Sequence, residues 1–338
     1  MKKKKIRLME VCGTHTMAIA RSGIKKLLPR EIELISGPGC PVCVTPQSDI
    51  DRAVKIAGTK DVIMATFGDM MRVPGTGGSL EGAKRDGADV RIVYSCTDAL
   101  KIAEDNPLKK VVFMGVGFET TSPTVASTVL EAEKRKVRNF FILSNFKVLF
   151  PALEALASSK RIKVDGFICP GHVSVITGSV PYECVAKRYG KPCVITGFDD
   201  SDIINGIKRL VDQVRAHSSK VEIEYKRAVA KGGNVKAKKV LEKAFEARSS
   251  HWRGIGEIAK SGLKLKKEYE RFDAEKEFKV KVPKPAVPKG CVCGAVLQGI
   301  KSPKNCVLFG KKCTPQTPVG PCMVSSEGTC AAYYKYGG

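Results

Sequence analysis

The sequence predicts an α/β protein in which two similar domains of βαβ units, each with a parallel sheet, precede a smaller helical, cysteine-rich domain. Three observations lead to this. The chain of 338 residues is too long for one compact core. Seven short apolar runs recur along its first two thirds, most of them followed by a helix-like segment. Six of the thirteen cysteines lie in the last 48 residues.

The apolar runs are rich in Val, Ile and Phe and nearly continuous, which is typical of strands buried on both faces of a parallel sheet. In order along the chain they are residues 31–37, 62–68, 91–95, 109–117, 139–145, 164–171 and 191–198. Helical patterns such as QSDIDRAVKIAG and PTVASTVLEAEKRK stand between them. This alternation indicates βαβ units.

The expected domains are 1–107, 108–215 and 216–338. The first boundary rests on domain length and on the turn-like EDNPLKK. After about residue 216 the chain becomes charged and helical in period, and residues 279–290 read as an extended Pro–Lys linker.

Composition narrows the classes of protein. No apolar run reaches 18 residues, and the basic start has no long apolar segment behind it, so neither a membrane span nor a signal peptide is expected. We expect a cytoplasmic protein, in which thirteen cysteines indicate thiol chemistry or metal ligation rather than structural disulfides. The net charge of +24 is attributed to a lysine-rich surface. Nucleic-acid binding is the less favoured alternative, and neither a nucleic-acid nor a membrane partner is expected.

Two N-terminal motifs carry donor atoms. Cys12 and His15 stand three residues apart in VCGTHT, and thiolate with imidazole suits iron, zinc or copper. A buried thiol with a core histidine is the alternative. Cys40 and Cys43 in GPGCPVC form a pair that fits either a metal clamp or a redox disulfide.

Polar, glycine-rich loops follow several predicted strands. They include GPGCPVC, FGDMMRVPGTGGS, GVGFETTSPT and CPGHVSVITGS, and in a parallel sheet such loops meet at the carboxyl ends of the strands. Each alone is as readily a tight turn, and no phosphate-binding glycine motif is present. We therefore expect a common crevice without a nucleotide.

The C-terminal cysteines give the strongest pattern. Cys306, Cys313, Cys322 and Cys330 are separated by turns of Gly, Pro, Ser and Thr, which fits a cubane [4Fe–4S] cluster with its own loop geometry. Zinc and a knot of disulfides are the alternatives. Zinc is less favoured, because only the C-x-C of residues 291–293 comes near the short cysteine pairs of zinc sites. Either cysteine of that pair could replace one of the four ligands.

The remaining cysteines, Cys96, Cys169, Cys184 and Cys193, are expected to be inert packing thiols. Cys169 is the best exception, because ICPGH carries His172 toward the proposed crevice.

Taken together, EVCGTHTMAI, GPGCPVCVTP, FGDMMRVPG, VGFETTSPT, CPGHVSVI and CTPQTPVGPCMVSSEGTCAAYY resemble the HypD family of hydrogenase formation proteins, essentially end to end. YSCTDAL departs from the expected pattern and puts a role for Cys96 in doubt. The resemblance implies a scaffold with two α/β domains and a [4Fe–4S] domain, which builds the Fe(CN)2CO unit of nickel–iron hydrogenases with the chaperone HypC and the cyanide donor HypE.

The resemblance also implies the roles of individual residues. Cys12 would hold the iron together with a HypC cysteine, with His15 close by. Cys40 and Cys43 would form a redox pair served by the cluster, as in ferredoxin:thioredoxin reductase. Whether such a scaffold counts as an enzyme stays open. The alternative function is a thiol–disulfide oxidoreductase that acts on protein substrates.

Overall fold

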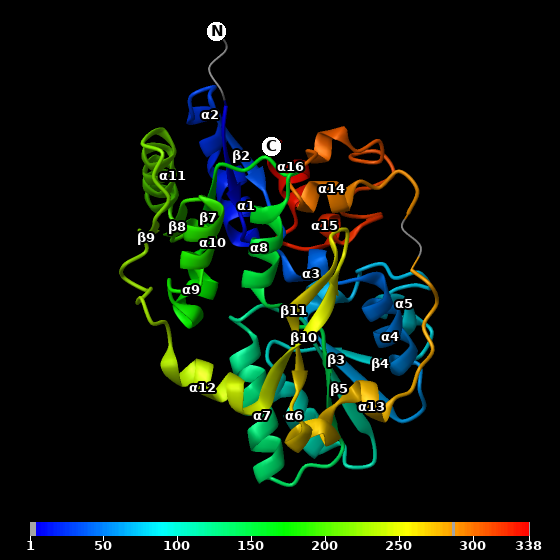
Figure 1. The fold of residues 1–338 in the computed structure, drawn as a ribbon. Helices are drawn as coiled ribbons and strands as arrows, with labels where there is room; N and C mark the ends of the chain where they lie inside the picture. Colours follow the sequence, from blue (N-terminus) through cyan, green and yellow to red (C-terminus); the bar gives the residue numbers. More distant parts are fainter. Residues whose placement is uncertain (1–4, 286–287, 338) are drawn as a thin grey trace.

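The computed structural model describes residues 5–285 and 288–337 and contains two parallel sheets joined by crossing segments of the chain (Figure 1). The first, sheet A, has the strand order β2-β1-β7-β8-β9. Its strands are β1 (Ile6–Glu10), β2 (Ile32–Ser36), β7 (Gly166–Pro170), β8 (Cys193–Thr196) and β9 (Val221–Ile223). The predicted class of fold is confirmed, and each of the seven predicted runs contains or overlaps a strand.

Sheet A is covered by helices on both faces, because successive side chains of a strand point to opposite sides. Leu8 packs with residues of α1 (Gly13–Ser22) and α11 (Asp200–Arg215). Met9, the next residue, packs with residues of α8 (Leu149–Ser158) and α10 (Tyr182–Tyr189). Both side chains are fully buried.

Sheet B has the order β4-β3-β5-β6 and is built from the middle of the chain. Its strands are β3 (Val62–Thr66), β4 (Asp89–Ile92), β5 (Lys110–Gly115) and β6 (Phe140–Ser144). One face packs on α6 (Cys96–Asp105) and α7 (Ser122–Lys134), and the other on α4 (Gln47–Ala57) and α5 (Leu80–Arg85).

The two sheets do not divide at the predicted boundary of 107/108. Strands β3 and β4 lie before that boundary and β5 and β6 after it, yet all four share sheet B. Sheet A in turn pairs β1 with β7, placing Leu8 opposite Gly166. It also includes β9, beyond residue 216. The predicted boundary is wrong because strands from distant parts of the chain pair with one another. Domain length and local turn patterns contain no information about such pairing.

The charged segment after residue 216 also differs from the expected run of helices. It forms α12 (Val235–Ala244) and then an antiparallel hairpin of β10 (Phe245–Trp252) and β11 (Gly256–Leu265). The hairpin buries Phe245, Leu263 and Leu265 in the core beside sheet B. Two further short helices, η2 (Lys267–Phe272) and α13 (Ala274–Glu277), complete this segment.

The cysteine-rich end of the chain consists of short helices and turns. These are α14 (Cys293–Leu297), η3 (Pro303–Asn305), α15 (Pro321–Val324) and α16 (Thr329–Tyr336). The expected linker precedes them, and its residues 286–287 lie outside the described residues. Figure 1 shows this end beside the N-terminal strands, where α16 packs on α1. In the part of the chain that the structure describes, no helix is long and apolar enough to cross a membrane.

Candidate functional site

Cys12 lies just beyond the carboxyl end of β1, the strand that pairs with β2 on one side and β7 on the other in sheet A. It is the N-terminal cap of α1, and its side chain is buried. Burial raises the pKa of the Cys12 thiol to about 11, and the nearby Glu327 carboxylate adds to the rise. Cys12 is therefore a neutral thiol at pH 7, and a bound metal ion would have to displace its proton.

The loop after β2 lies directly against Cys12. The Gly13 amide donates a hydrogen bond of 3.0 Å to the carbonyl of Gly39. Gly39 has no room for a side chain, because a Cβ atom there would overlap the backbone of Cys12. This close approach carries Cys40, the next residue, to the Cys12 motif.

Cys40 and Cys43 form a disulfide across the single-turn helix α3 (Pro41–Val44), with Cα atoms 5.2 Å apart. Proline at the first helical position starts the turn without losing a needed N–H donor. The Cys43 amide donates to the Cys40 sulfur over 3.1 Å. Both sulfurs are buried, so the predicted pair stands as a disulfide beside Cys12.

His15 is fully buried on α1 and held by sheet A. Its Nε2 lies 2.8 Å from the Gly197 carbonyl oxygen and 2.9 Å from Thr196 Oγ1. Because a carbonyl oxygen only accepts, Nε2 carries the proton and Nδ1 keeps a free lone pair. Burial lowers the pKa of His15 to about 4, so the imidazole is neutral. Among the described residues Nδ1 has no hydrogen-bond partner.

Two aromatic rings extend this group. The His15 ring lies 4.7 Å from that of Phe198, and Phe198 stacks on His172 at 4.0 Å between centroids. His172 is the histidine of the CPGH motif, and burial lowers its pKa too. The structure therefore brings the predicted Cys12, His15 and His172 together near the carboxyl ends of β1, β7 and β8.

Glu327 completes the group, which we call the Cys12 site: Cys12, His15, His172, Phe198 and Glu327. The Thr14 hydroxyl donates to Glu327 Oε1 over 2.7 Å, which ties α1 to the loop between α15 and α16. Sequence reasoning missed Glu327 and Phe198. The only signal for Glu327 was its place in SSEGTC, between two of the predicted cluster cysteines.

All six C-terminal cysteines line one cavity, the cysteine cavity, with an otherwise largely apolar wall. Its members are Cys291, Cys293, Cys306, Cys313, Cys322 and Cys330. Within residues 5–285 and 288–337 no group of three or more His, Cys, Asp or Glu side chains is arranged to hold a metal ion. The donor set nevertheless fits a soft metal centre, because several thiols face one water-poor space.

Several cysteines of this cavity contact one another, and Cys322 interacts with both Cys293 and Cys330. The Cys293 and Cys322 sulfurs lie 3.0 Å apart. The contact lowers the pKa of Cys293, because the Cys322 thiol donates to its thiolate. Burial raises the pKa of Cys291 to about 12, and Cys293, Cys306 and Cys330 face it as further like charges. Cys313 accepts a hydrogen bond from the Val319 amide over 3.4 Å.

The cysteine cavity borders the Cys40–Cys43 disulfide. Helix α15, which carries Cys322, packs on α3. Cys40, Cys43, Cys293 and Cys322 belong to one apolar cluster. The chain thus places the disulfide between the Cys12 site and the cysteine cavity.

Arg253 lies at the same junction, in the turn of the β10–β11 hairpin. Its Nε donates to the Thr45 carbonyl over 2.9 Å, and its Nη2 to the Pro74 carbonyl over 3.3 Å. The backbone amide of Arg253 donates to Val44 at the end of α3. Its charge faces Cys291, Cys293 and Cys322, while burial lowers the pKa of the guanidinium. Sequence reasoning missed this residue too.

The other cysteines lie away from these groups. Cys96, Cys169 and Cys193 are buried, and burial raises the pKa of Cys96 and Cys169. Cys184 is exposed, and its thiol donates to Glu154 Oε1 over 3.0 Å. A role as inert thiols stays a prediction for all four.

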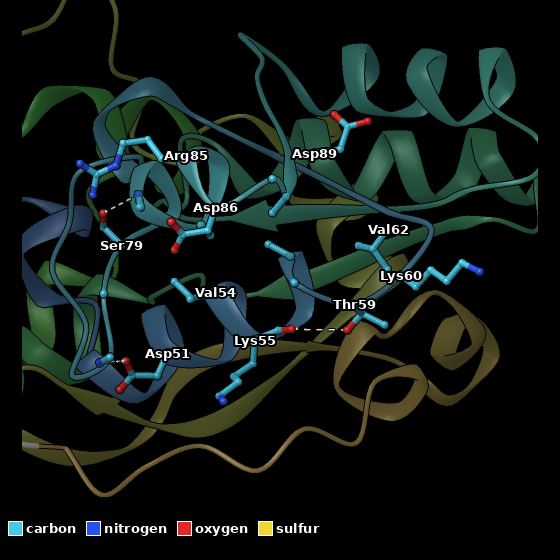
Figure 2. Close-up of a pocket in the computed structure, with 18 of the residues that line it drawn as sticks. Asp51, Val54, Lys55, Thr59, Lys60, Val62, Ser79, Arg85, Asp86 and Asp89 are labelled. Atoms are coloured by element: carbon cyan, nitrogen blue, oxygen red, sulfur yellow. Dashed lines mark hydrogen bonds between the residues drawn. The ribbon is translucent and has the colours of Figure 1, made fainter.

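A groove of about 1150 Å3 opens elsewhere, between α4, α5 and the linker (Figure 2). Asp61 and Asp89 in its wall stand at the amino ends of β3 and β4, and Figure 2 shows charged side chains of both signs around it. The loops that form sites in parallel sheets lie at the opposite, carboxyl edge. This groove is therefore separate from the candidate site.

The fold and the site together define an α/β protein with a buried disulfide next to a cysteine–histidine site and a cavity of six cysteines. The chain belongs to the HypD family: the family described as "HypD: Hydrogenase formation hypA family" matches residues 1–337. It is 48% identical to the hydrogenase maturation factor HypD of Escherichia coli, covering 98% of this chain and 89% of the relative.

Two further relatives agree. The chain is 47% identical to the hydrogenase maturation factor HypD2 of Bradyrhizobium diazoefficiens, over 99% of this chain and 90% of the relative. It is 46% identical to the hydrogenase maturation factor HypD of Cupriavidus necator, over 97% of this chain and 89% of the relative. The chain therefore has a role in hydrogenase maturation.

Proposed function

We propose that the protein is a redox scaffold on which the Fe(CN)2CO unit of nickel–iron hydrogenases is assembled in the cytoplasm. In this proposal HypC shares the iron and HypE donates cyanide. One observation carries it: the Cys40–Cys43 disulfide lies between Cys12 and the cysteine cavity, because Gly39 contacts the Cys12 motif and α3 packs on α15. Family membership supports the role in maturation.

The iron is the cargo of this scaffold, and Cys12 is its proposed protein ligand. A thiolate is a soft donor that suits low-spin iron, and one protein ligand leaves positions open for cyanide and CO. The buried Cys12 thiol, with its pKa of about 11, would lose its proton only as the metal binds. The free Nδ1 lone pair of His15 would accept a hydrogen bond from an incoming group.

A [4Fe–4S] cluster is the proposed resident cofactor of the cysteine cavity, and it would supply single electrons. The proposed ligands are Cys291, Cys306, Cys313 and Cys330. Cys322 of the predicted set is replaced by Cys291 in this proposal because its sulfur lies 3.0 Å from that of Cys293, although it also hydrogen-bonds Cys330. Cys293 and Cys322 are then free to act as a dithiol. The apolar wall would exclude water, and the Val319 amide would donate to the Cys313 sulfur.

In this proposal, two cysteine pairs allow the disulfide to receive two electrons in one exchange. Opening a disulfide takes two electrons, whereas a cubane cluster exchanges one at a time. In this proposal the Cys293/Cys322 dithiol becomes a disulfide and the Cys40–Cys43 disulfide becomes a dithiol, which conserves two electrons and two protons.

The alternative function is a thiol–disulfide oxidoreductase acting on protein substrates, which the two adjacent cysteine pairs also favour. Reduction of an insulin disulfide distinguishes the two. A Cys12→Ala variant with full insulin-reducing activity supports the alternative, because that reaction does not need an iron ligand.

Iron chemistry tests the leading proposal. Anaerobically purified protein is expected to contain about four irons and four sulfides per chain in the cluster. The complex with HypC is expected to show Fe–CN and Fe–CO infrared bands, which Cys12→Ala abolishes and Cys184→Ala, at an exposed control cysteine, leaves in place. Colourless protein with one zinc and no sulfide contradicts the cluster. Bands that persist in Cys12→Ala remove Cys12 from the iron site.

A further inference from the structure

A chain of hydrogen-bonding groups connects the buried Cys40 sulfur to the protein surface. The Ser325 hydroxyl lies 3.3 Å from Cys40 Sγ and 3.2 Å from Asp69 Oδ2. Cys40 and Ser325 are only 3% and 1% exposed, whereas Asp69 is half-buried. Asp69 comes from the FGDMMRVPG motif after β3, and Ser325 from the end of α15.

Asp69 is fixed on this serine by additional donors. The Ser326 amide and hydroxyl both donate to Asp69 Oδ2 over 2.9 Å. The Glu327 amide in turn donates to Ser325 Oγ over 3.2 Å. With the disulfide closed, the Ser325 hydroxyl proton is directed toward Asp69. When Cys40 becomes a thiolate, the same hydroxyl can turn and donate to its sulfur, because both acceptors lie within 3.3 Å of Oγ.

We propose that Ser325 exchanges a proton with Cys40 when the Cys40–Cys43 disulfide opens and closes, and that Asp69 positions its hydroxyl. This inference rests on the proposed function, in which the disulfide is used. It assigns a catalytic role to Ser325, which touches the reacting sulfur, and a positioning role to Asp69. It also gives the FGD motif a chemical purpose.

The proton exchange balances the redox step. When the S–S bond breaks, two electrons enter and each sulfur takes one proton, giving two thiols. The electrons come from a dithiol, Cys293/Cys322 in the chain or dithiothreitol in a test, which becomes a disulfide and releases two protons. Without a proton path, a thiolate would be left in an apolar cluster, where an unpaired charge is costly.

The other charged and titratable groups around Cys40 lie on four packed elements. On α3 itself Cys43 is the partner sulfur, and its amide donates to Cys40. Cys12 is on the α1 side and Cys322 on α15. The Glu327 carboxylate is bonded to Thr14, and the Arg253 guanidinium to carbonyls at the end of α3 and in the 74–75 loop. Ser325 connects Cys40 to the carboxylate of Asp69 through two hydrogen bonds.

The test measures the pKa of Cys40 in the reduced, iron-free full-length protein. Iodoacetamide alkylates the protein between pH 5.5 and 10, and tandem mass spectrometry gives the rate at Cys40 alone. Ser325→Ala is expected to lower the ionisation constant of Cys40 about tenfold, because the thiolate loses its hydroxyl donor. Asp69→Asn is expected to raise the constant, because a nearby negative charge is removed. Ser325→Thr keeps the hydroxyl and is expected to match the wild type.

Ser158→Ala is the control and is expected to leave the profile unchanged, because this exposed serine at the end of α8 donates only to the Ala155 carbonyl. The inference is overturned if Ser325→Ala leaves the profile unchanged, if Ser325→Thr moves it equally, or if Asp69→Asn moves it in the same direction as Ser325→Ala. If Ser325→Ala does not fold, Asp69→Asn decides alone, and an unmoved profile overturns the inference.

The outcome is separate from that of the proposed function. The profile is read on thiols without iron, whereas the scaffold is read from infrared bands of the iron-loaded complex. If the infrared bands persist in Cys12→Ala and the Cys40 profiles are as expected, Cys12 is not the iron ligand but the proposed proton exchange between Ser325 and Cys40 stands. If dithiothreitol cannot open the disulfide at any pH, the proposed proton exchange is wrong, while the infrared bands still test the proposed scaffold function.

Discussion

Cys293 on α14 and Cys322 on α15 place their sulfur atoms 3.0 Å apart inside the cysteine cavity. Each therefore has a thiol as its nearest reactive neighbour, and Cys322 also lies on the helix that packs against the Cys40–Cys43 disulfide. Cys322 also hydrogen-bonds Cys330. In the proposed assignment, Cys293 and Cys322 form a dithiol and the other four cysteines of the cavity are the cluster ligands.

The first prediction follows from this division. Cys291→Ser is expected to reduce iron by more than half, because it removes one of four cluster ligands. Cys293→Ser, two residues away and at the same cavity, is expected to retain about four irons per chain. Iron and sulfide analysis of anaerobically purified protein measures both. Equal loss of iron in the two variants would contradict the division.

The second prediction concerns Arg253, whose positive charge lowers the pKa of Cys293. Arg253→Gln is expected to raise that pKa, because the positive charge that favours the Cys293 thiolate is removed. Alkylation of Cys293 by iodoacetamide at pH 7 would then slow severalfold. Arg253→Lys keeps the charge and is expected to stay within about threefold of the wild type. A lysine variant as slow as the glutamine variant would show that the hydrogen bonds to Thr45 and Pro74 matter instead.

The sequence predicted the strands of both sheets better than their assembly. Apolar runs such as residues 139–145 are visible because a strand buried on both faces has no polar alternation. Strand β1 was missed because Arg7 and Glu10 interrupt its apolar pattern, although it ends just before Cys12. The sheet order depends on pairings such as Leu8 with Gly166, which no local pattern contains.

The candidate site shows the same limit. Cys12, His15, Cys40 and Cys43 were recognisable because their motifs are local. The contact between Cys293 and Cys322 joins residues separated by a long, irregular loop, so spacing could not distinguish it from cluster ligation. Glu327 reaches Thr14 only because α16 packs on α1.

The third prediction is a pH dependence of stability at Glu119. Burial raises the pKa of this carboxyl to about 7, from an ordinary value of 4.5. The folded protein therefore holds a proton that the unfolded chain releases. The stability contributed by the protonated group is complete below pH 4.5 and is lost as the pH rises to about 7.

Glu119→Gln is expected to remove this loss. Its amide oxygen would still accept the 3.0 Å hydrogen bond from the Leu149 amide. At pH 8 the variant is expected to gain about 2–3 kcal/mol of unfolding free energy over the wild type, and little at pH 4.5. Urea unfolding at both pH values measures the difference, with the exposed Glu81→Gln as a control. An equal effect of Glu119→Gln at both pH values would contradict the raised pKa.

The last prediction concerns the contact that brings Cys40 to Cys12. Gly39→Ala would push a Cβ atom into the backbone of Cys12, and neither backbone segment can yield without moving a motif. The variant is expected to lose more than about 2 kcal/mol of stability, as overpacking in a rigid core does. Gly77→Ala is the matched control, because open space surrounds that glycine. If urea unfolding gives the same midpoint for both variants, the loop can move away from Cys12, and this contact does not hold the disulfide beside the proposed iron ligand.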